Sequence, residues 1–191
     1  HYIKAHYPDL FTIADAKRGD IGNTSLRYAK AFFEAMPFDS ITIAPYMGKD
    51  SVEPFLTYKD KHAILLALTS NQGAADFQFT QNTDKPLFKE VLATSLKYDN
   101  ADRLMYVVGA TKADYLKKIR DIVPNAFLLI PGVGAQGGSL KDVFENGANE
   151  QVGLLVNSSR GILYASNGKD YVAAASKVAA SLQSQMQKLL A

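Results

Sequence analysis

The segment Asp15-Ala-Lys17-Arg-Gly-Asp20 places two carboxylates and a lysine close enough to act together. Side chains two residues apart on a β-strand share a face, so Asp15 and Lys17 should point the same way, preceded on that face by Phe11 and Ile13. If that face lines an apolar interior, the lysine is held by its carboxylate neighbour instead of being freely hydrated. A salt bridge that ties a strand to its loop has the same spacing, and spacing alone does not separate the two interpretations.

Two segments near the C-terminus could bind an anion. Asn157-Ser-Ser-Arg160-Gly161 follows the last predicted strand and opens a short helical run, where backbone N–H groups and a guanidinium can hold a phosphate. Pro131-Gly-Val-Gly-Ala-Gln136-Gly-Gly138 follows the strand before it, and its glycines let the backbone approach a ligand closely. Each segment alone also fits an ordinary turn, but together on adjacent final strands they match the phosphate grip of β/α barrels.

Other chemistry finds little support in the residues. The chain has no cysteine, which excludes disulfides and thiolate catalysis. Its three histidines, His1, His6 and His62, are scattered without the spacing of a metal site, so we expect no metal. Ser158 and Ser159 have no paired histidine, which argues against a nucleophilic serine.

Short apolar runs alternate with longer amphipathic stretches along the whole chain. The predicted strands are Leu10–Ala14, Ser40–Ala44, Ala63–Leu68, Leu104–Val108, Ala126–Ile130 and Val152–Asn157. The predicted helices are Ser25–Met36, Ser51–Tyr58, Pro86–Leu96, Lys112–Val123, Ser139–Asn146 and Asp170–Leu190. The last helix carries an apolar stripe that should pack on a sheet, and Gly73–Lys85 reads as a polar loop that could form a lid or a small hairpin.

This alternation predicts an α/β fold with parallel strands and right-handed crossovers. The polar and glycine-rich residues cluster directly after the strands, as a (β/α)8 TIM barrel requires, although a doubly wound open sheet would share part of that pattern. Six βα units are two short of a closed barrel. We expect residues 1–191 to form a single domain, the C-terminal part of such a barrel, with strands 3 to 8.

Composition sets limits on partners. The 191 residues are 47% hydrophobic and 21% charged, with a net charge of only +2, which predicts neither a nucleic-acid nor a membrane-surface partner. No apolar run could span a bilayer and no signal peptide opens the chain, so we expect a cytoplasmic protein. The opening residues read as the end of a helix cut from something longer.

Asp15-Ala-Lys17-Arg-Gly-Asp20-Ile21-Gly-Asn-Thr24 resembles the Asp-x-Lys-x-x-Asp signature of the orotidine 5′-phosphate decarboxylases, in the form of the family's longer branch. Four further motifs follow in family order along essentially the whole chain: Pro45-Tyr-Met-Gly48, Thr69-Ser-Asn71, Pro131–Gly138 and Asn157–Gly161. The resemblance implies decarboxylation of orotidine 5′-monophosphate to uridine 5′-monophosphate without a cofactor, in de novo pyrimidine synthesis.

The resemblance also implies roles for individual residues. Lys17 would donate a proton to C6 of the pyrimidine as carbon dioxide departs, and Asp15 would sit beside the substrate carboxylate and hold Lys17. In a homodimer, Asp20 would enter the partner's site, where Ile21 and Thr24 would also contact the ligand. The other expected substrate contacts are Thr69 and Ser70 at the pyrimidine edge, Pro131 at the base pocket, and Gln136, Arg160 and Gly161 at the phosphate.

Two alternatives stay open at this stage. Magnesium-dependent sugar-phosphate decarboxylases and hexulose-phosphate synthases of the same superfamily share Asp-x-Lys-x-x-Asp, and a non-catalytic phosphate-binding module would need fewer of these residues. The family also has a ribose-binding aspartate on its first strand and a second lysine on its second strand. Neither strand is visible in this sequence, so we expect the catalytic array and the barrel to be incomplete as the chain stands.

Overall fold

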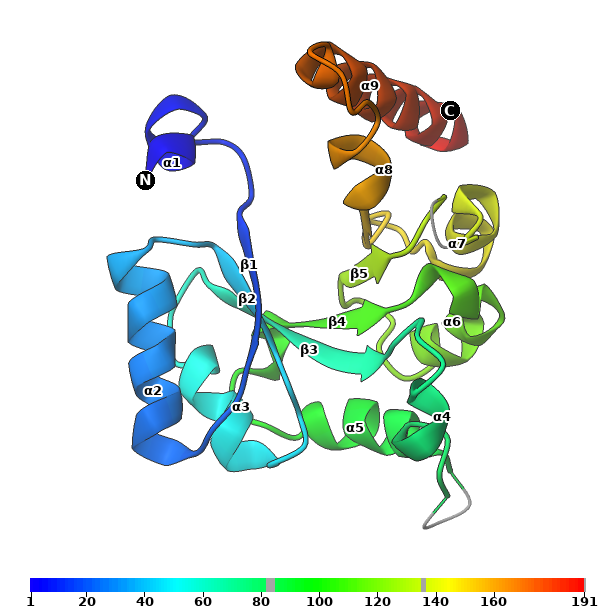
Figure 1. Ribbon diagram of the computed structural model, residues 1–191. Coiled ribbons are helices and arrows are strands. Elements are labelled where there is room, and N and C mark those ends of the chain that lie inside the picture. Colours follow the sequence, from blue (N-terminus) through cyan, green and yellow to red (C-terminus); the bar gives the residue numbers. More distant parts are fainter. Residues whose placement is uncertain (82–84, 135–136, 191) are drawn as a thin grey trace.

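The computed structural model describes residues 1–81, 85–134 and 137–190. Their strands form one sheet that curls with its helices on the outside (Figure 1). The strands are β1 (Ile13–Arg18), β2 (Ser40–Ile43), β3 (His62–Leu68), β4 (Leu104–Val108), β5 (Leu128–Pro131) and β6 (Leu154–Asn157). All five neighbouring pairs are parallel and follow chain order from β1 to β6, which confirms the predicted succession of βα units in a partial TIM barrel.

One helix, α1, precedes the sheet, and at least one helix follows every strand. The helices are α1 (Tyr2–His6), α2 (Gly22–Lys30), α3 (Lys49–Leu56), α4 (Ala74–Phe77), α5 (Leu87–Ser95), α6 (Ala113–Arg120), α7 (Leu140–Gly147), α8 (Arg160–Leu163) and α9 (Tyr171–Leu190). A π-helical turn, Ala31–Ala35, continues α2 and accounts for the greater length predicted there. The loop predicted at Gly73–Lys85 contains α4 and an antiparallel bridge between Gln81 and Pro86, and residues 82–84 lie outside the described residues.

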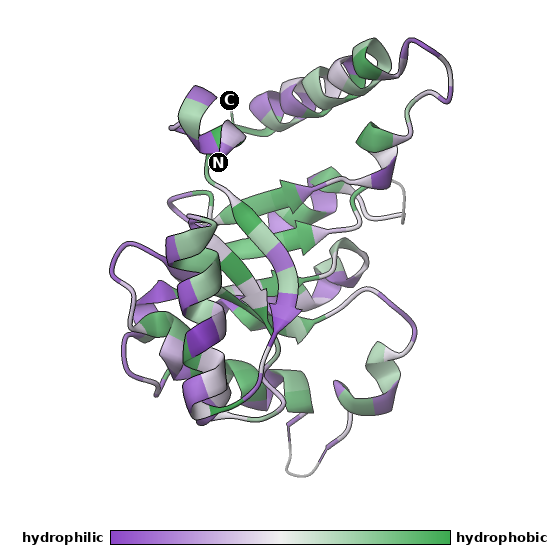
Figure 2. Cartoon of the chain, turned by 60° about the vertical axis from the view of Figure 1, so that its left-hand side comes forward, coloured by the Kyte–Doolittle hydropathy of each residue, from purple (hydrophilic) through white to green (hydrophobic). Residues whose placement is uncertain are grey.

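Central strands of the sheet carry buried apolar side chains on both faces. In β4, Tyr106 and Val108 belong to the core between the sheet and its helices, while Met105 and Val107 belong to a second cluster on the other face. This is the reason that the strands read as continuous apolar runs instead of alternating ones. Figure 2 shows the contrast between these apolar strands and helices of mixed hydropathy. Burial of each large side chain, such as Phe55 of α3, stabilises the fold by about 1.5–3 kcal/mol.

The first strand was predicted too early. It spans Ile13–Arg18 instead of Leu10–Ala14, so Asp15 and Lys17 lie within the strand and not after it. The apolar pattern placed the strand too early because it ignored the polar residues that follow Ala14. These residues continue the strand, and its pairing with β2 begins only at Ile13, opposite Ser40. Hydrogen bonding with a neighbouring strand, and not apolar character, therefore decides where β1 lies.

The expected packing of the last helix on a sheet was wrong. No residue of α9, all of which is described, is buried, and its main neighbours are α7 and α8. Figure 1 shows α9 beyond α8, at the far end of the molecule from β2 and β3. Its apolar stripe is real, since Leu182, Met186 and Leu189 are partly covered, but the strands of this chain do not reach it. No described helix is long and apolar enough to cross a membrane.

Candidate active site

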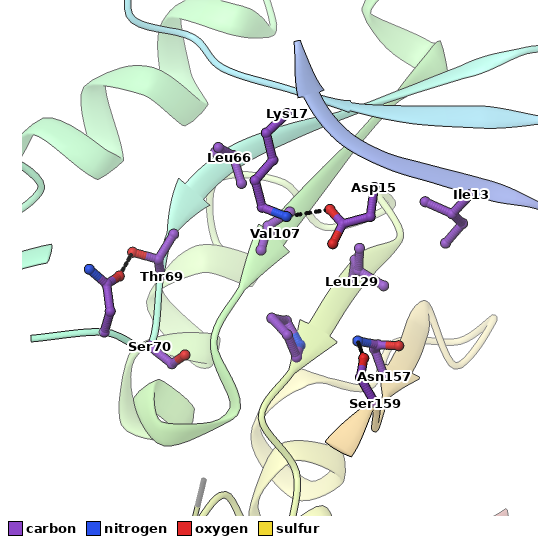
Figure 3. Close-up of a pocket in the computed structure, with 12 residues that line it drawn as sticks. Ile13, Asp15, Lys17, Leu66, Thr69, Ser70, Val107, Leu129, Asn157 and Ser159 are labelled. Atoms are coloured by element: carbon purple, nitrogen blue, oxygen red, sulfur yellow. Dashed lines mark hydrogen bonds and ion pairs between the residues drawn. The ribbon is translucent and has the colours of Figure 1, made fainter. Parts of the chain in front are cut away.

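A pocket of about 370 Å³ opens at the carboxyl ends of the strands, where a β/α barrel carries its chemistry. Its apolar floor comes from inward-facing strand residues, and its polar rim comes from strand ends and the loops after them (Figure 3). The lining residues are Ile13, Asp15, Lys17, Leu66, Thr69, Ser70, Asn71, Val107, Leu129, Pro131, Asn157 and Ser159. Five residues predicted for the site therefore line one cavity: Asp15, Lys17, Thr69, Ser70 and Pro131.

Asp15 and Lys17 form an ion pair inside this pocket. The Lys17 ammonium nitrogen lies 2.5 Å from Oδ1 of Asp15, and both side chains are more than half exposed, at 53% for Lys17 and 63% for Asp15. Figure 3 shows them projecting into the space between Thr69 and Ser70 on one side and Asn157 and Ser159 on the other. A pair this open to solvent contributes little to stability, which removes the main support for a purely structural role.

The predicted shared face of Asp15 and Lys17 is observed, but strand alternation is not its cause. The pairing of β1 with β2 slips between Ala14 and Arg18, so β1 carries a bulge there. Lys17 lies in the bulge with a φ of 48°, in the left-handed region that a lysine seldom adopts. Such local strain clusters at functional sites, where the surrounding structure holds it in place.

Thr42 of β2 holds the bulge together. Its hydroxyl accepts a hydrogen bond from the main-chain N–H of Lys17 at 2.9 Å and donates to Oδ1 of Asp15 at 3.0 Å. Thr42 is fully buried, so both contacts are anchored on a side chain that is fixed in the interior. The sequence analysis missed this residue, and its one signal was a hydroxyl in the otherwise apolar run Ile41-Thr42-Ile43.

The wall formed by Thr69 and Ser70 depends on a close backbone approach. A Cβ added to Gly109, which directly follows β4, would lie 2.6 Å from the main-chain nitrogen of Ser70. Only glycine fits at that contact, so the end of β4 can support Ser70 directly. Asn71 also lines the pocket and accepts a hydrogen bond from the Thr69 hydroxyl at 2.6 Å, a contact that was not predicted.

A second, smaller pocket of about 190 Å³ adjoins the first and shares Pro131, Asn157 and Ser159 with it. The guanidinium-bearing Arg160 lines this second pocket, as expected for an anion site after the last strand. Gly161 follows Arg160 in α8 and does not line either pocket. Gln136, predicted to hold phosphate, lies outside the described residues.

Asp20, Ile21 and Thr24 are not brought into the pocket. All three are exposed, and Asp20 has a φ of 81° with its carboxylate accepting from the N–H of Ile21 at 2.8 Å. Thr24 lies on the first turn of α2, which begins at Gly22 and not at Ser25 as predicted. The structure therefore separates the predicted residues into a pocket group and an outward-facing group.

A lysine–carboxylate pair beside a guanidinium-lined pocket, at the carboxyl ends of a curled parallel sheet, is the arrangement of an enzyme of the β/α-barrel class. The sequence model described as "Orotidine 5'-phosphate decarboxylase / HUMPS family" matches residues 1–177. The chain belongs to this family.

Relatives of known name agree with this assignment. The chain is 63% identical over 185 residues to the orotidine 5′-phosphate decarboxylase of Christiangramia forsetii, with 97% of this chain and 68% of that protein covered. It is 60% identical over 190 residues to the enzyme of that name from Flavobacterium johnsoniae, with 100% of this chain and 70% of that protein covered. The chain thus spans about two thirds of these relatives' length.

Solved structures show the same fold. The orotidine 5′-monophosphate decarboxylase of Plasmodium berghei superposes with a TM-score of 0.81 at 28% identity, over 99% of this chain and 59% of that one. The OMP decarboxylase of Leishmania donovani superposes with a TM-score of 0.76 at 35% identity, over 87% of this chain and 64% of that one.

Proposed function

We propose that this chain carries the decarboxylation of orotidine 5′-monophosphate to uridine 5′-monophosphate, with Lys17 as the proton donor to C6. The observation that carries the proposal is the Lys17–Asp15 pair inside a pocket that continues into the Arg160 pocket. The first pocket has an apolar floor and a polar rim suited to a flat ring, and the second suits the phosphate. The names of the relatives support this substrate over a sugar phosphate.

The chemistry follows from the charges in the pocket. Breaking the bond between C6 and the carboxylate carbon releases carbon dioxide and leaves the bonding electron pair on C6. The Lys17 ammonium favours that developing negative charge and then transfers one proton to C6, which leaves a neutral amine. Asp15 holds the ammonium in place and adds a negative charge near the substrate carboxylate. A phosphate bound at Arg160, remote from C6, contributes binding energy to positioning.

The outward-facing residues favour a homodimer. Asp20, Ile21 and Thr24 are exposed, and apolar side chains lie on nearby segments, with Leu26 of α2 at 42% exposure and Met47 at 48%. In an isologous dimer the same surface occurs twice, so Asp20 of each subunit would reach the other's pocket. We place this dimer in the cytoplasm, where a biosynthetic enzyme for a nucleotide works.

A chelator separates the proposal from the magnesium-dependent alternative. The full-length protein, treated with EDTA and mixed with saturating orotidine 5′-monophosphate, should bleach the orotate absorbance of the substrate at the same rate as untreated protein. Loss of activity on chelation, restored by Mg²⁺, would favour the sugar-phosphate enzymes. Nucleotide binding with no turnover in either sample would favour the non-catalytic module.

A further inference from the structure

Gly138, in the glycine-rich segment after β5, packs against Ala110 with no room for a side chain of its own. A Cβ added to Gly138 would lie 2.3 Å from Cβ of Ala110 and 3.2 Å from its carbonyl carbon. The φ of Gly138 is not positive, so the close approach, and not the backbone angle, requires glycine here. Ala110 begins a short helical turn, Ala110–Lys112, after β4, and both residues of the contact are buried.

The Ala110 side of this contact is held in place. Ala110 is 2% exposed and belongs to the core between the sheet and its helices. The preceding Gly109 donates its main-chain N–H to Leu68 O at 2.8 Å. At the other end of the turn, the Lys112 ammonium lies 5.3 Å from the centre of the Phe79 ring, a favourable cation–π contact. Ala110 therefore presents a fixed methyl group to the segment after β5.

The Gly138 side of the contact leads to the pocket that Arg160 lines. The carbonyl of Gly138 accepts from the N–H of Gly134 at 3.0 Å, and its own N–H donates to Gly132 O at 3.3 Å. Gly138 also forms a parallel bridge with Val133. Gly132 and Val133 line the second pocket together with Arg160. Because backbone hydrogen bonds join these residues, a shift of Gly138 moves the wall of that pocket.

We propose that Ala110 is a positioning residue, whose methyl group sets the place of the Gly132–Val133 wall through Gly138 and so fits the second pocket to a phosphate ester. The inference rests on the proposed function for the identity of that ester, a nucleotide. Ala110 lines neither of the two pockets, so it acts through Gly138 and not by touching the ligand. The property that depends on this role is the preference for a nucleotide over its nucleoside.

The test measures dissociation constants of the full-length protein for uridine 5′-monophosphate and uridine by calorimetry. Their ratio does not respond to changes that weaken both ligands equally. Gly138→Ala places a methyl group against Ala110, so the wall must shift, and the preference for the nucleotide should fall about tenfold.

A double variant tests the contact itself. Ala110→Gly combined with Gly138→Ala moves the methyl group to the other side of the contact and removes the 2.3 Å approach, which leaves Gly132 O as the nearest neighbour at 3.0 Å. The ratio should return to within about threefold of the wild-type value, since only a small adjustment remains. Rescue by a second substitution that itself removes packing is not expected of a merely structural effect.

Gly147→Ala is the matched control. Gly147 is a buried glycine at the end of α7, and a Cβ added there would meet only the ends of leucine side chains, at 3.0 Å or more. Gly147 lines neither of the two pockets. This substitution should leave the ratio of the two dissociation constants unchanged, whatever it does to stability.

An unchanged ratio in Gly138→Ala would overturn the role of Ala110, and so would a double variant with a ratio no better than that of Gly138→Ala. If Gly138→Ala does not fold, Ala110→Val presses on the same contact from the other side, and an unchanged ratio there would also overturn the inference. A wild-type protein that binds the nucleotide no more tightly than uridine would reject the proposed phosphate site itself, and the inference with it. Comparison with the wild type thus separates the two failures.

Discussion

The main-chain N–H of Lys17 donates to the buried hydroxyl of Thr42 at 2.9 Å, in place of the carbonyl that a regular strand would supply. That hydroxyl also donates to Oδ1 of Asp15 at 3.0 Å, so a single atom of β2 orients both members of the ion pair. The unusual backbone of Lys17 is thereby tied to the placement of its ammonium.

Thr42→Val keeps the shape of Thr42 and removes this link. We expect kcat for decarboxylation to fall about tenfold and the free energy of unfolding to fall by about 1 kcal/mol, because the partly buried N–H of Lys17 loses its acceptor. Affinity for uridine 5′-monophosphate should change by less than about twofold, since the phosphate contacts stay intact. Ser40→Ala is the control, as it removes a buried hydroxyl from the opposite end of the same strand. Equal losses of kcat in both variants would assign the effect to packing.

Arg160→Ala should weaken nucleotides and not nucleosides. A charge-assisted contact with phosphate is worth about 1.5–3 kcal/mol, which corresponds to about a 10- to 150-fold loss of affinity for uridine 5′-monophosphate. Uridine lacks the phosphate, so its weak binding should stay the same. Lys169→Ala removes an exposed positive charge that lines neither pocket and serves as the control. Parallel losses for nucleotide and nucleoside would make Arg160 a structural residue.

Two inactive variants should restore activity when mixed. In the proposed dimer, each site takes Lys17 from one subunit and Asp20 from the other. A heterodimer of the Lys17→Ala and Asp20→Ala chains therefore has one site with both residues intact and one site with neither. Random exchange makes about half of the molecules heterodimers, and activity should return to about a quarter of the wild-type value per site. Subunit exchange is verified separately by mass-tagged chains. Verified exchange without any recovery would mean that Asp20 acts within its own chain.

Asp39 should make the fold sensitive to acid. Burial alone would raise the pKa of Asp39, but bonds from Lys4 at 2.6 Å and from Thr12 at 2.7 Å outweigh it and hold that pKa below its usual value of 3.8. A lowered pKa in the folded state means that the contribution to stability is complete above about pH 4 and is lost as the pH falls through the lowered value. Asp39→Asn should unfold more readily than the wild type at pH 7, and the difference should shrink toward pH 2 in denaturant titrations. A difference independent of pH would leave the charge of Asp39 without a role.

Residues that line the pocket could be predicted from the sequence more fully than the backbone features that support them. Asp15 and Lys17 were predicted because charged residues stand out next to an apolar run, whereas Thr69, Ser70 and Pro131 were predicted from the family resemblance, and all five line the pocket. The bulge of β1 left no trace in the pattern, because a slip in strand pairing is a property of two segments and not of one.

A supporting residue was missed for a related reason. Thr42 acts through a hydrogen bond to a residue 25 positions away, and nothing in its local sequence marks that partner. The apolar stripe of α9 was read correctly as a pattern, but a pattern does not say whether a sheet lies beneath it.

The most direct test measures kcat for decarboxylation of orotidine 5′-monophosphate and the dissociation constant for uridine 5′-monophosphate in wild type and Lys17→Ala. If the ammonium acts as negative charge forms on C6, kcat should fall by about a thousandfold or more, while product affinity should change by less than about tenfold. Comparable losses in kcat and product affinity would contradict the account, because Lys17 would then support only the fold or the bound ground state.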